Sequence, residues 1–135
     1  MKKYMLALAL AITFAGSAFG AVKEYDGVTV DVPADWTDFV QGPLVALVAP
    51  ERQTVITIIT GSAHGASAKE IAETIAAQAK APAPVADDDG YIIRATQDGQ
   101  NAAILVTVVG GAAIILNMAG DHPDMIKVAK SVKPK

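Results

Sequence analysis

The sequence predicts an α+β fold, in which an antiparallel β-sheet of five to six strands has helices packed on its faces. Two observations lead to this prediction. Residues 91–119 hold three apolar segments joined by Asp-Gly and Gly-Gly, which favour tight hairpin turns because these turns need positive φ. Residues 68–80 instead repeat apolar side chains at helical spacing. Helices set apart from an antiparallel meander are typical of the α+β class.

The first half of the chain predicts strands. Residues 25–32 alternate apolar and polar side chains, which indicates one strand with a single buried face. Residues 36–40 predict a short second strand. Residues 44–49 form a continuous apolar run, typical of a buried strand, and residues 54–60 are rich in β-branched side chains. We expect these last two segments to pair as a hairpin across the polar turn at 51–53.

A helix is predicted from residue 68 to about residue 80. Ser67 and Glu70 have the spacing of a capping box, in which each side chain bonds the other residue's backbone N–H. The prolines within residues 81–84 end the helix and begin a loop that runs to Gly90. The predicted inner face of the helix consists of Ala68, Ile71, Ala72, Ile75, Ala76 and Ala79.

Three further strands are expected at residues 91–97, 102–109 and 112–119. The second and third are apolar at nearly every position, whereas a sheet open to water on one side would alternate. The sequence therefore predicts that both faces of these two strands are covered.

A final helix is predicted over residues 123–132. Asp121 or His122 is expected to cap it, and Pro123 suits its first turn. Its predicted inner face consists of Met125, Val128, Ala129 and Val132.

Residues 1–20 have the pattern of a secretory signal peptide. Two lysines precede an apolar run from Met5 to Ala15, and small residues occupy Ala18 and Gly20. The run is shorter than the ~20 residues that a bilayer requires, so we expect cleavage and no membrane span afterwards. The mature chain would be one α/β domain, residues 21–135, located in the periplasm or secreted.

Composition narrows the classes of partner. Loss of Lys2 and Lys3 leaves 9 basic and 14 acidic residues, a net charge of −5, so the chain lacks the basic surface that nucleic acids require. It has no cysteine, which excludes disulfides and a lipid anchor on cysteine.

Two histidines are candidate catalytic residues. His64 follows Ser62 in a glycine-flanked loop, and nucleophilic catalysis there would also need an orienting acid and oxyanion donors. A simple strand-to-helix loop is the alternative. His122 lies between Asp121 and Asp124 and would offer a transition metal nitrogen and oxygen ligands, although helix capping also explains the acids.

Asp87, Asp88 and Asp89 are the densest charge in the chain. Consecutive acids do not match an EF-hand, which places its ligands at alternate positions. Two interpretations stay open: a solvated turn, or weak binding of a hard cation. With Asp121, these residues are the candidate metal ligands.

Trp36 and Arg94 are candidate binding residues, together with His64 and His122. Trp36 is the single tryptophan and would either pack a corner after the first strand or anchor a partner. Arg94 interrupts an apolar strand and would point either into a groove or into solvent at a sheet edge.

Two segments, Gly27 to Trp36 and Ile126 to Lys133, resemble the PsbP-like group, which includes an extrinsic subunit of photosystem II and a Ran-binding nuclear import factor. There an opening strand runs into a Pro-x-x-Trp corner, and a Ser-Val ending follows the last helix. The resemblance covers residues 24–133. It implies a three-layer α/β/α sandwich and a role in assembly, binding or cofactor retention, and it transfers no catalytic residue to this chain.

We therefore expect a non-enzymatic exported domain that binds a periplasmic protein or a small ligand and needs no cofactor. One alternative is a hydrolase or metal-dependent enzyme using His64 or His122 with nearby acids, and another is a weak metal-ion binding protein. An enzyme needs these groups to converge in one pocket, whereas a binding domain needs an exposed apolar patch or groove.

Overall fold

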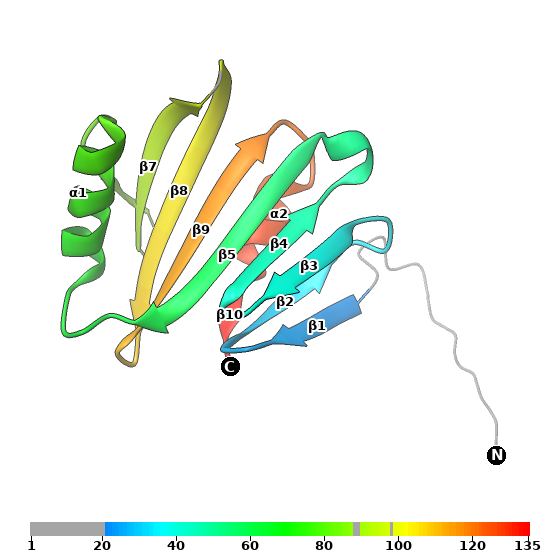
Figure 1. The fold of residues 1–135 in the computed structure, drawn as a ribbon, viewed down its shortest axis with the longest axis horizontal. Helices are drawn as coiled ribbons and strands as arrows, with labels where there is room; N and C mark the ends of the chain where they lie inside the picture. The colour runs from blue at the N-terminus through cyan, green and yellow to red at the C-terminus, as the bar shows by residue number, and fades with distance from the viewer. Residues whose placement is uncertain (1–20, 88–89, 98) are drawn as a thin grey trace.

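The computed structural model describes residues 21–87, 90–97 and 99–135, so the predicted signal peptide at 1–20 lies outside the described residues. Figure 1 shows strands as the dominant element, with two helices among the described residues. The elements are β1 (Ala21–Tyr25), β2 (Val28–Val32), β3 (Thr37–Gln41), β4 (Leu44–Val48), a 3-10 turn (Pro50–Arg52), β5 (Thr54–Ser62), α1 (Ala68–Ala79), β6 (Val85–Asp87), β7 (Gly90–Gln97), β8 (Gln100–Val109), β9 (Ala112–Gly120), α2 (Met125–Lys130) and β10 (Lys133–Pro134).

The main sheet is antiparallel, as predicted, but it has seven strands in the order β3-β4-β5-β9-β8-β7-β6, so the expected five to six strands is wrong. The hairpin of β4 with β5 and the meander β7-β8-β9 are confirmed. One extra strand, β6, comes from the predicted loop between residues 81 and 90, where Val85–Asp87 pair with residues 90–92.

A second sheet of three strands, in the order β1-β2-β10, was not predicted. The segment predicted as one strand over residues 25–32 in fact contains a turn at Asp26-Gly27, where Gly27 has φ 87°. Asp-Gly is a strong hairpin signal, and the alternation on its C-terminal side masked it. The third strand, β10, pairs Lys133 and Pro134 with β2 directly after the last helix.

Two apolar clusters lie on opposite faces of the main sheet, which confirms cover on both sides for β8 and for β9 as far as Leu116. On one face, Ala72 and Ala76 of α1 pack on Ile93, Ile104 and Val106. On the other face, the small sheet and α2 bury a larger cluster, and Figure 1 draws α2 behind β4 and β5. The second covering layer is therefore a helix together with a β-sheet, rather than helices alone as the sandwich implied.

Helix α1 begins as predicted. Ser67 Oγ accepts a bond from the Glu70 N–H at 3.1 Å, and Glu70 Oε1 accepts one from the Ser67 N–H at 2.9 Å. The helix ends at Ala79 because Lys80 adopts the left-handed conformation, with φ 56°. Its predicted inner face is confirmed except for Ala79, which is exposed.

Helix α2 is shorter than predicted, with six residues from Met125 to Lys130. Neither Asp121 nor His122 caps it: the N-cap residue is Asp124, whose side chain makes no capping bond. The predicted inner face holds, since Val128 and Ala129 are buried and Met125 and Val132 pack against the same cluster. Among the described residues, neither helix has the length and apolar character needed to cross a membrane.

Candidate functional site

The face of the main sheet that carries α1 is covered over only part of its width. Helix α1 contacts β7 and β8 and lies at the left of Figure 1, while no helix or strand of the described residues covers the front of β3, β4 and β5. Because side chains alternate along a strand and register fixes their neighbours, the residues on this uncovered area follow from the pairing. We call them the open face: Thr37, Phe39, Gln41, Leu44, Ala46, Val48, Val55, Thr57, Ile59, Asn117 and Ala119.

None of these eleven residues is charged. Phe39 is 60% exposed and Ile59 is 41% exposed, and the aliphatic residues between them are half-buried. Residues 44–49 were predicted as a buried strand. Val45, Leu47 and Ala49 are buried, but the other side of β4 is half-buried and belongs to the open face.

A hollow of about 500 Å³ indents one end of the open face, where β3, β4 and β5 meet the turn at Pro50. Phe39, Val48 and Val55 belong to its apolar lining, and Glu51 is the charged residue among the lining side chains that the structure describes. Its volume lies within the range of pockets that hold ligands. The hollow therefore suits a large apolar side chain offered by another molecule.

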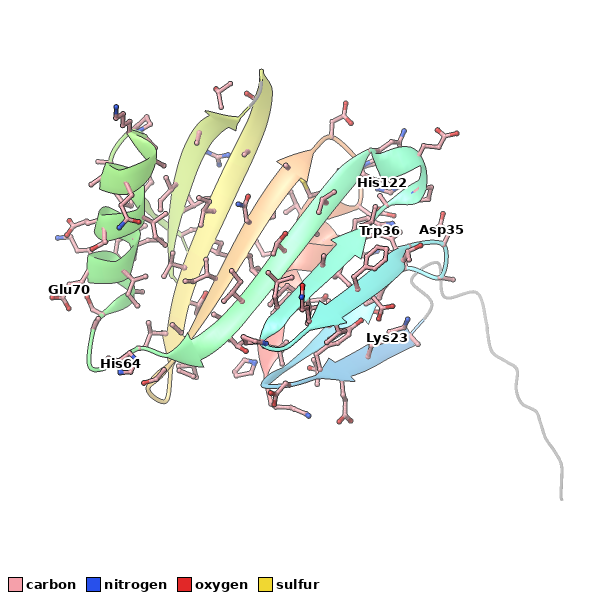
Figure 2. All side chains as sticks on the ribbon, in the orientation of Figure 1. Lys23, Asp35, Trp36, His64, Glu70 and His122 are labelled. Carbon is pink, nitrogen blue, oxygen red and sulfur yellow. The ribbon has the colours of Figure 1, made fainter. Side chains whose placement is uncertain are left out.

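The two histidines lie at opposite ends of β5, as Figure 2 shows. The His64 N–H donates to Ser62 Oγ at 3.1 Å, whereas the His122 N–H donates to Thr54 Oγ1 at 2.8 Å. Ser62 and Thr54 are the two terminal residues of β5, so the strand separates the imidazoles by roughly 27 Å. A site that uses both histidines is therefore not formed.

His122 is engaged in packing and in a local turn. Its Nδ1 accepts a bond from the Asp124 N–H at 3.0 Å, and its ring lies edge-on to Trp36 with the centroids 5.2 Å apart. Trp36 itself is 5% exposed and belongs to the larger core cluster, which agrees with the corner-packing interpretation. His64 is exposed at φ 51° in the loop before α1.

The proposed metal ligands do not gather in the part of the chain that the structure describes. Asp87 pairs with Lys130, with Oδ2 3.5 Å from Nζ, and Asp121 is exposed on the loop before α2. Asp88 and Asp89 lie outside the described residues. Within residues 21–87, 90–97 and 99–135, no group of three or more acidic or histidine side chains is placed to hold a metal ion.

Arg94 is exposed on β7 and lines a second hollow, of about 420 Å³, at the end of α1. This hollow agrees with the groove interpretation of Arg94. The position of Arg94 at a sheet edge also agrees with the solvent interpretation, because β6 pairs with residues 90–92 alone.

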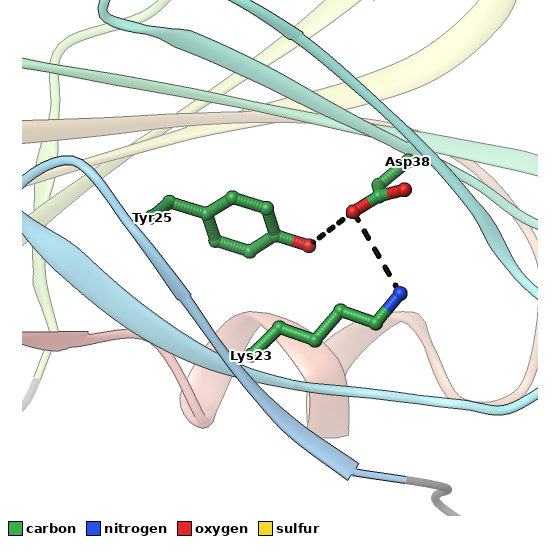
Figure 3. Close-up of polar contacts among 3 residues, drawn as sticks. All are labelled: Lys23, Tyr25 and Asp38. Carbon is green, nitrogen blue, oxygen red and sulfur yellow. Dashed lines mark hydrogen bonds and ion pairs between the residues drawn. The ribbon is translucent and has the colours of Figure 1, made fainter.

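A polar contact fastens the small sheet to the edge of the main sheet. Tyr25 of β1 donates its hydroxyl to Asp38 Oδ2 of β3 at 2.8 Å, and Lys23 Nζ lies 3.7 Å from the same oxygen (Figure 3). Burial, followed by the hydrogen bond and the negative charge of Asp38, raises the pKa of Tyr25 above its usual range. The contact holds β3 in place from behind, so that Phe39 points to the open face.

The sequence prediction missed the residues of the open face. Phe39 and Ile59 belong to strands that it did predict, but exposure depends on which side of the sheet α1 covers. The uninterrupted apolar run in β4 was the available signal: it marks two apolar faces, and the fold covers one of them.

Comparison with known proteins found no matching family model and no matching curated protein. A crystal structure from Bacteroides thetaiotaomicron matches with a TM-score of 0.53 and 13% identity, covering 80% of this chain. The aligned region spans 45% of that protein's length. The solution structure of cyanobacterial PsbP (CyanoP) from Synechocystis matches with a TM-score of 0.48 and 15% identity, covering 91% of this chain and 98% of that one. The likeness to the Bacteroides structure is therefore one of fold alone, from which function does not follow.

Proposed function

We propose that this chain is an exported, non-enzymatic binding domain that uses the open face to hold another protein. The observation that carries the proposal is the uncharged open face itself, with a 60% exposed Phe39 beside a hollow. Contiguous apolar surface with a polar rim is typical of interaction sites, and aromatic side chains dominate their binding energy.

Charge argues for a different protein rather than a second copy of this chain. Residues 21–135 carry nine basic and fourteen acidic side chains, a net charge of −5, so two copies of the domain would repel each other.

The lining of the hollow defines the chemistry of the partner. A large apolar side chain would fill the space against Phe39, Val48 and Val55, and a basic residue beside it would meet Glu51 at the rim. The partner is therefore a protein segment with an aromatic or large aliphatic anchor next to a lysine or arginine.

The placement of the histidines supports a non-enzymatic role. His122 Nδ1 is occupied by the Asp124 N–H, and His64 lies at the far end of β5. Neither imidazole lines either hollow described above. Acid–base or nucleophilic catalysis requires its side chains to converge in one pocket, and this arrangement does not bring the histidines into such a pocket.

Export is testable by mass spectrometry of the protein recovered from the periplasm. Cleavage after Gly20 or Ala18 would give a mature N-terminus at Ala21 or Phe19, as the small residues at the end of the leader predict. An intact chain beginning at Met1 and recovered with membranes would contradict export.

Photo-crosslinking in the cell tests the open face. Phe39 is replaced by p-benzoylphenylalanine, with Val22 and Ile126 replaced in the same way as controls, because both are exposed apolar residues away from this face. We expect one discrete adduct from position 39 that is lost when Ile59→Asp is added and kept when Val22→Asp is added. Equal adducts from all three positions, or none from position 39, would refute the proposal.

A further inference from the structure

The hollow at the end of α1 lies where three segments meet. Ala79 to Pro82 form one wall, and Arg94 to Thr96 of β7, with Asn101 of β8, form the other. Since β6 stops pairing at residue 92, the edge of β7 away from β8 has no described strand beside this wall. The hollow is therefore open to solvent and has a volume of about 420 Å³, which exceeds the space needed by a single ion.

Among the described residues, the charged side chains that line this hollow are both basic. Lys80 and Arg94 are its charged lining residues, and neither forms an ion pair with an acid among the described residues. Residues 21–135 contain nine basic side chains against fourteen acidic ones, so two cations from separate elements that line one space with no described acid paired to either are unexpected. Nearby cations without a carboxylate attract an anion from solution.

The remaining lining is of two kinds. Thr96 and Asn101 offer a hydroxyl and an amide, which can donate to an oxyanion. Ala79, Ala81, Pro82 and Ala95 offer apolar surface. An inorganic ion would leave that apolar surface in contact with water, whereas an organic anion would cover it.

We infer that the hollow between Lys80 and Arg94 binds a small organic anion, with its carboxylate at the two cations and a short apolar body against the alanines and Pro82. The guanidinium of Arg94 suits a carboxylate because its planar fork donates two parallel bonds. This site is separate from the open face and does not depend on the protein partner proposed above.

An NMR titration of the full chain with hexanoate tests the inference. We expect saturable shifts of the backbone amides of Ala81, Ala95 and Asn101. Acetate, which lacks the apolar body, is expected to bind at least fivefold more weakly, and hexanamide, which lacks the charge, is expected to produce no saturable shift. Equal affinity for hexanoate and hexanamide, equal affinity for hexanoate and acetate, or no saturation with hexanoate would overturn the inference.

Variants assign the charge to its residues. Lys80→Asn and Arg94→Gln are each expected to weaken hexanoate binding about tenfold, since each removes a charge-assisted contact. Asparagine is chosen at position 80 because it tolerates the left-handed backbone there. Lys69→Gln, on an exposed part of α1 outside the hollow, is the matched control and is expected to change nothing. If Lys69→Gln weakened hexanoate binding equally, the loss would come from the net charge of the protein, which would contradict a specific site in the hollow.

The test also separates this site from the proposed function. Phe39→Asp, on the open face, is expected to leave hexanoate binding unchanged. If it weakens hexanoate binding as much as Arg94→Gln does, the two sites are not independent and the inference fails.

Discussion

At the residue scale, the contact between Tyr25 and Asp38 predicts a loss of stability at alkaline pH. The pKa of Tyr25 is raised in the folded state, so folding favours the protonated phenol. Its contribution is fully present below the pKa of an unfolded tyrosine, about 10. It declines as pH rises through the higher folded value, because the unfolded chain then holds fewer protons than the folded one.

Urea unfolding between pH 9 and 11.5 measures this effect. We expect the free energy of unfolding to fall with pH more steeply in the wild type than in Tyr25→Phe, which has no phenol to ionise. Tyr91→Phe is the matched control, since Tyr91 packs against the other core cluster and should leave the wild-type slope unchanged. The same slope in Tyr25→Phe and wild type would contradict this assignment.

Truncation of Trp36 is predicted to cause a large loss of stability. Its indole is buried against His122, while its Nε1–H has no hydrogen-bond partner among the described residues. Trp36→Ala should lower the free energy of unfolding by about 3–5 kcal/mol by opening a cavity. Trp36→Phe keeps an aromatic ring and removes the unpaired donor, so its cost should be less than half of that. Chemical denaturation of both variants checks the order, and equal losses would show that the indole N–H is satisfied in solution.

At the element scale, the ends of α1 were more predictable than those of α2. The Ser67 and Glu70 spacing encodes its own geometry locally, and the structure shows both bonds. Asp121 and His122 have the composition of a cap, but Thr54 of β5 accepts the His122 N–H, and a tertiary contact thus replaces the local one. The second sheet was missed for a related reason: β10 is two residues long and exists through pairing with β2.

The capping box gives a prediction at the same scale. Ser67→Ala should destabilise the fold by about 1 kcal/mol, because the Glu70 N–H loses its acceptor. Lys69→Ala, an exposed change in the same turn, should have little effect and serves as the control. Thermal unfolding followed by circular dichroism distinguishes them, and equal midpoints for the two variants would show that the cap is not used.

The capping carboxylate adds a pH dependence. The bonds that Glu70 accepts from the Ser67 backbone lower its pKa. Its contribution to stability is therefore present above the unfolded pKa of a glutamate, near 4.3, and is lost as pH falls through the lower folded value. The stability difference between Glu70→Gln and wild type should disappear in that acidic range.

At the scale of the whole molecule, the α+β class and the pairing of the central strands could be predicted, because period-two patterns and tight turns are local signals. The open face could not. Leu44, Ala46 and Val48 have the same apolar character as the buried Val45 and Leu47, and they differ only in which side of the sheet a remote helix covers. The distance between the candidate residues could not be predicted either. His64 and His122 were chosen by chemical type, and the fold places them at opposite ends of β5.

The affinity of the crosslinked partner for surface variants tests the central claim, binding through the open face, most directly. The partner identified at position 39 is titrated calorimetrically into wild type, Phe39→Asp and Val22→Asp, all first shown to be folded. We predict that Phe39→Asp weakens binding at least tenfold, because it places a charge where an apolar anchor packs, and that Val22→Asp binds as tightly as wild type. Equal affinity of Phe39→Asp and wild type would contradict the claim.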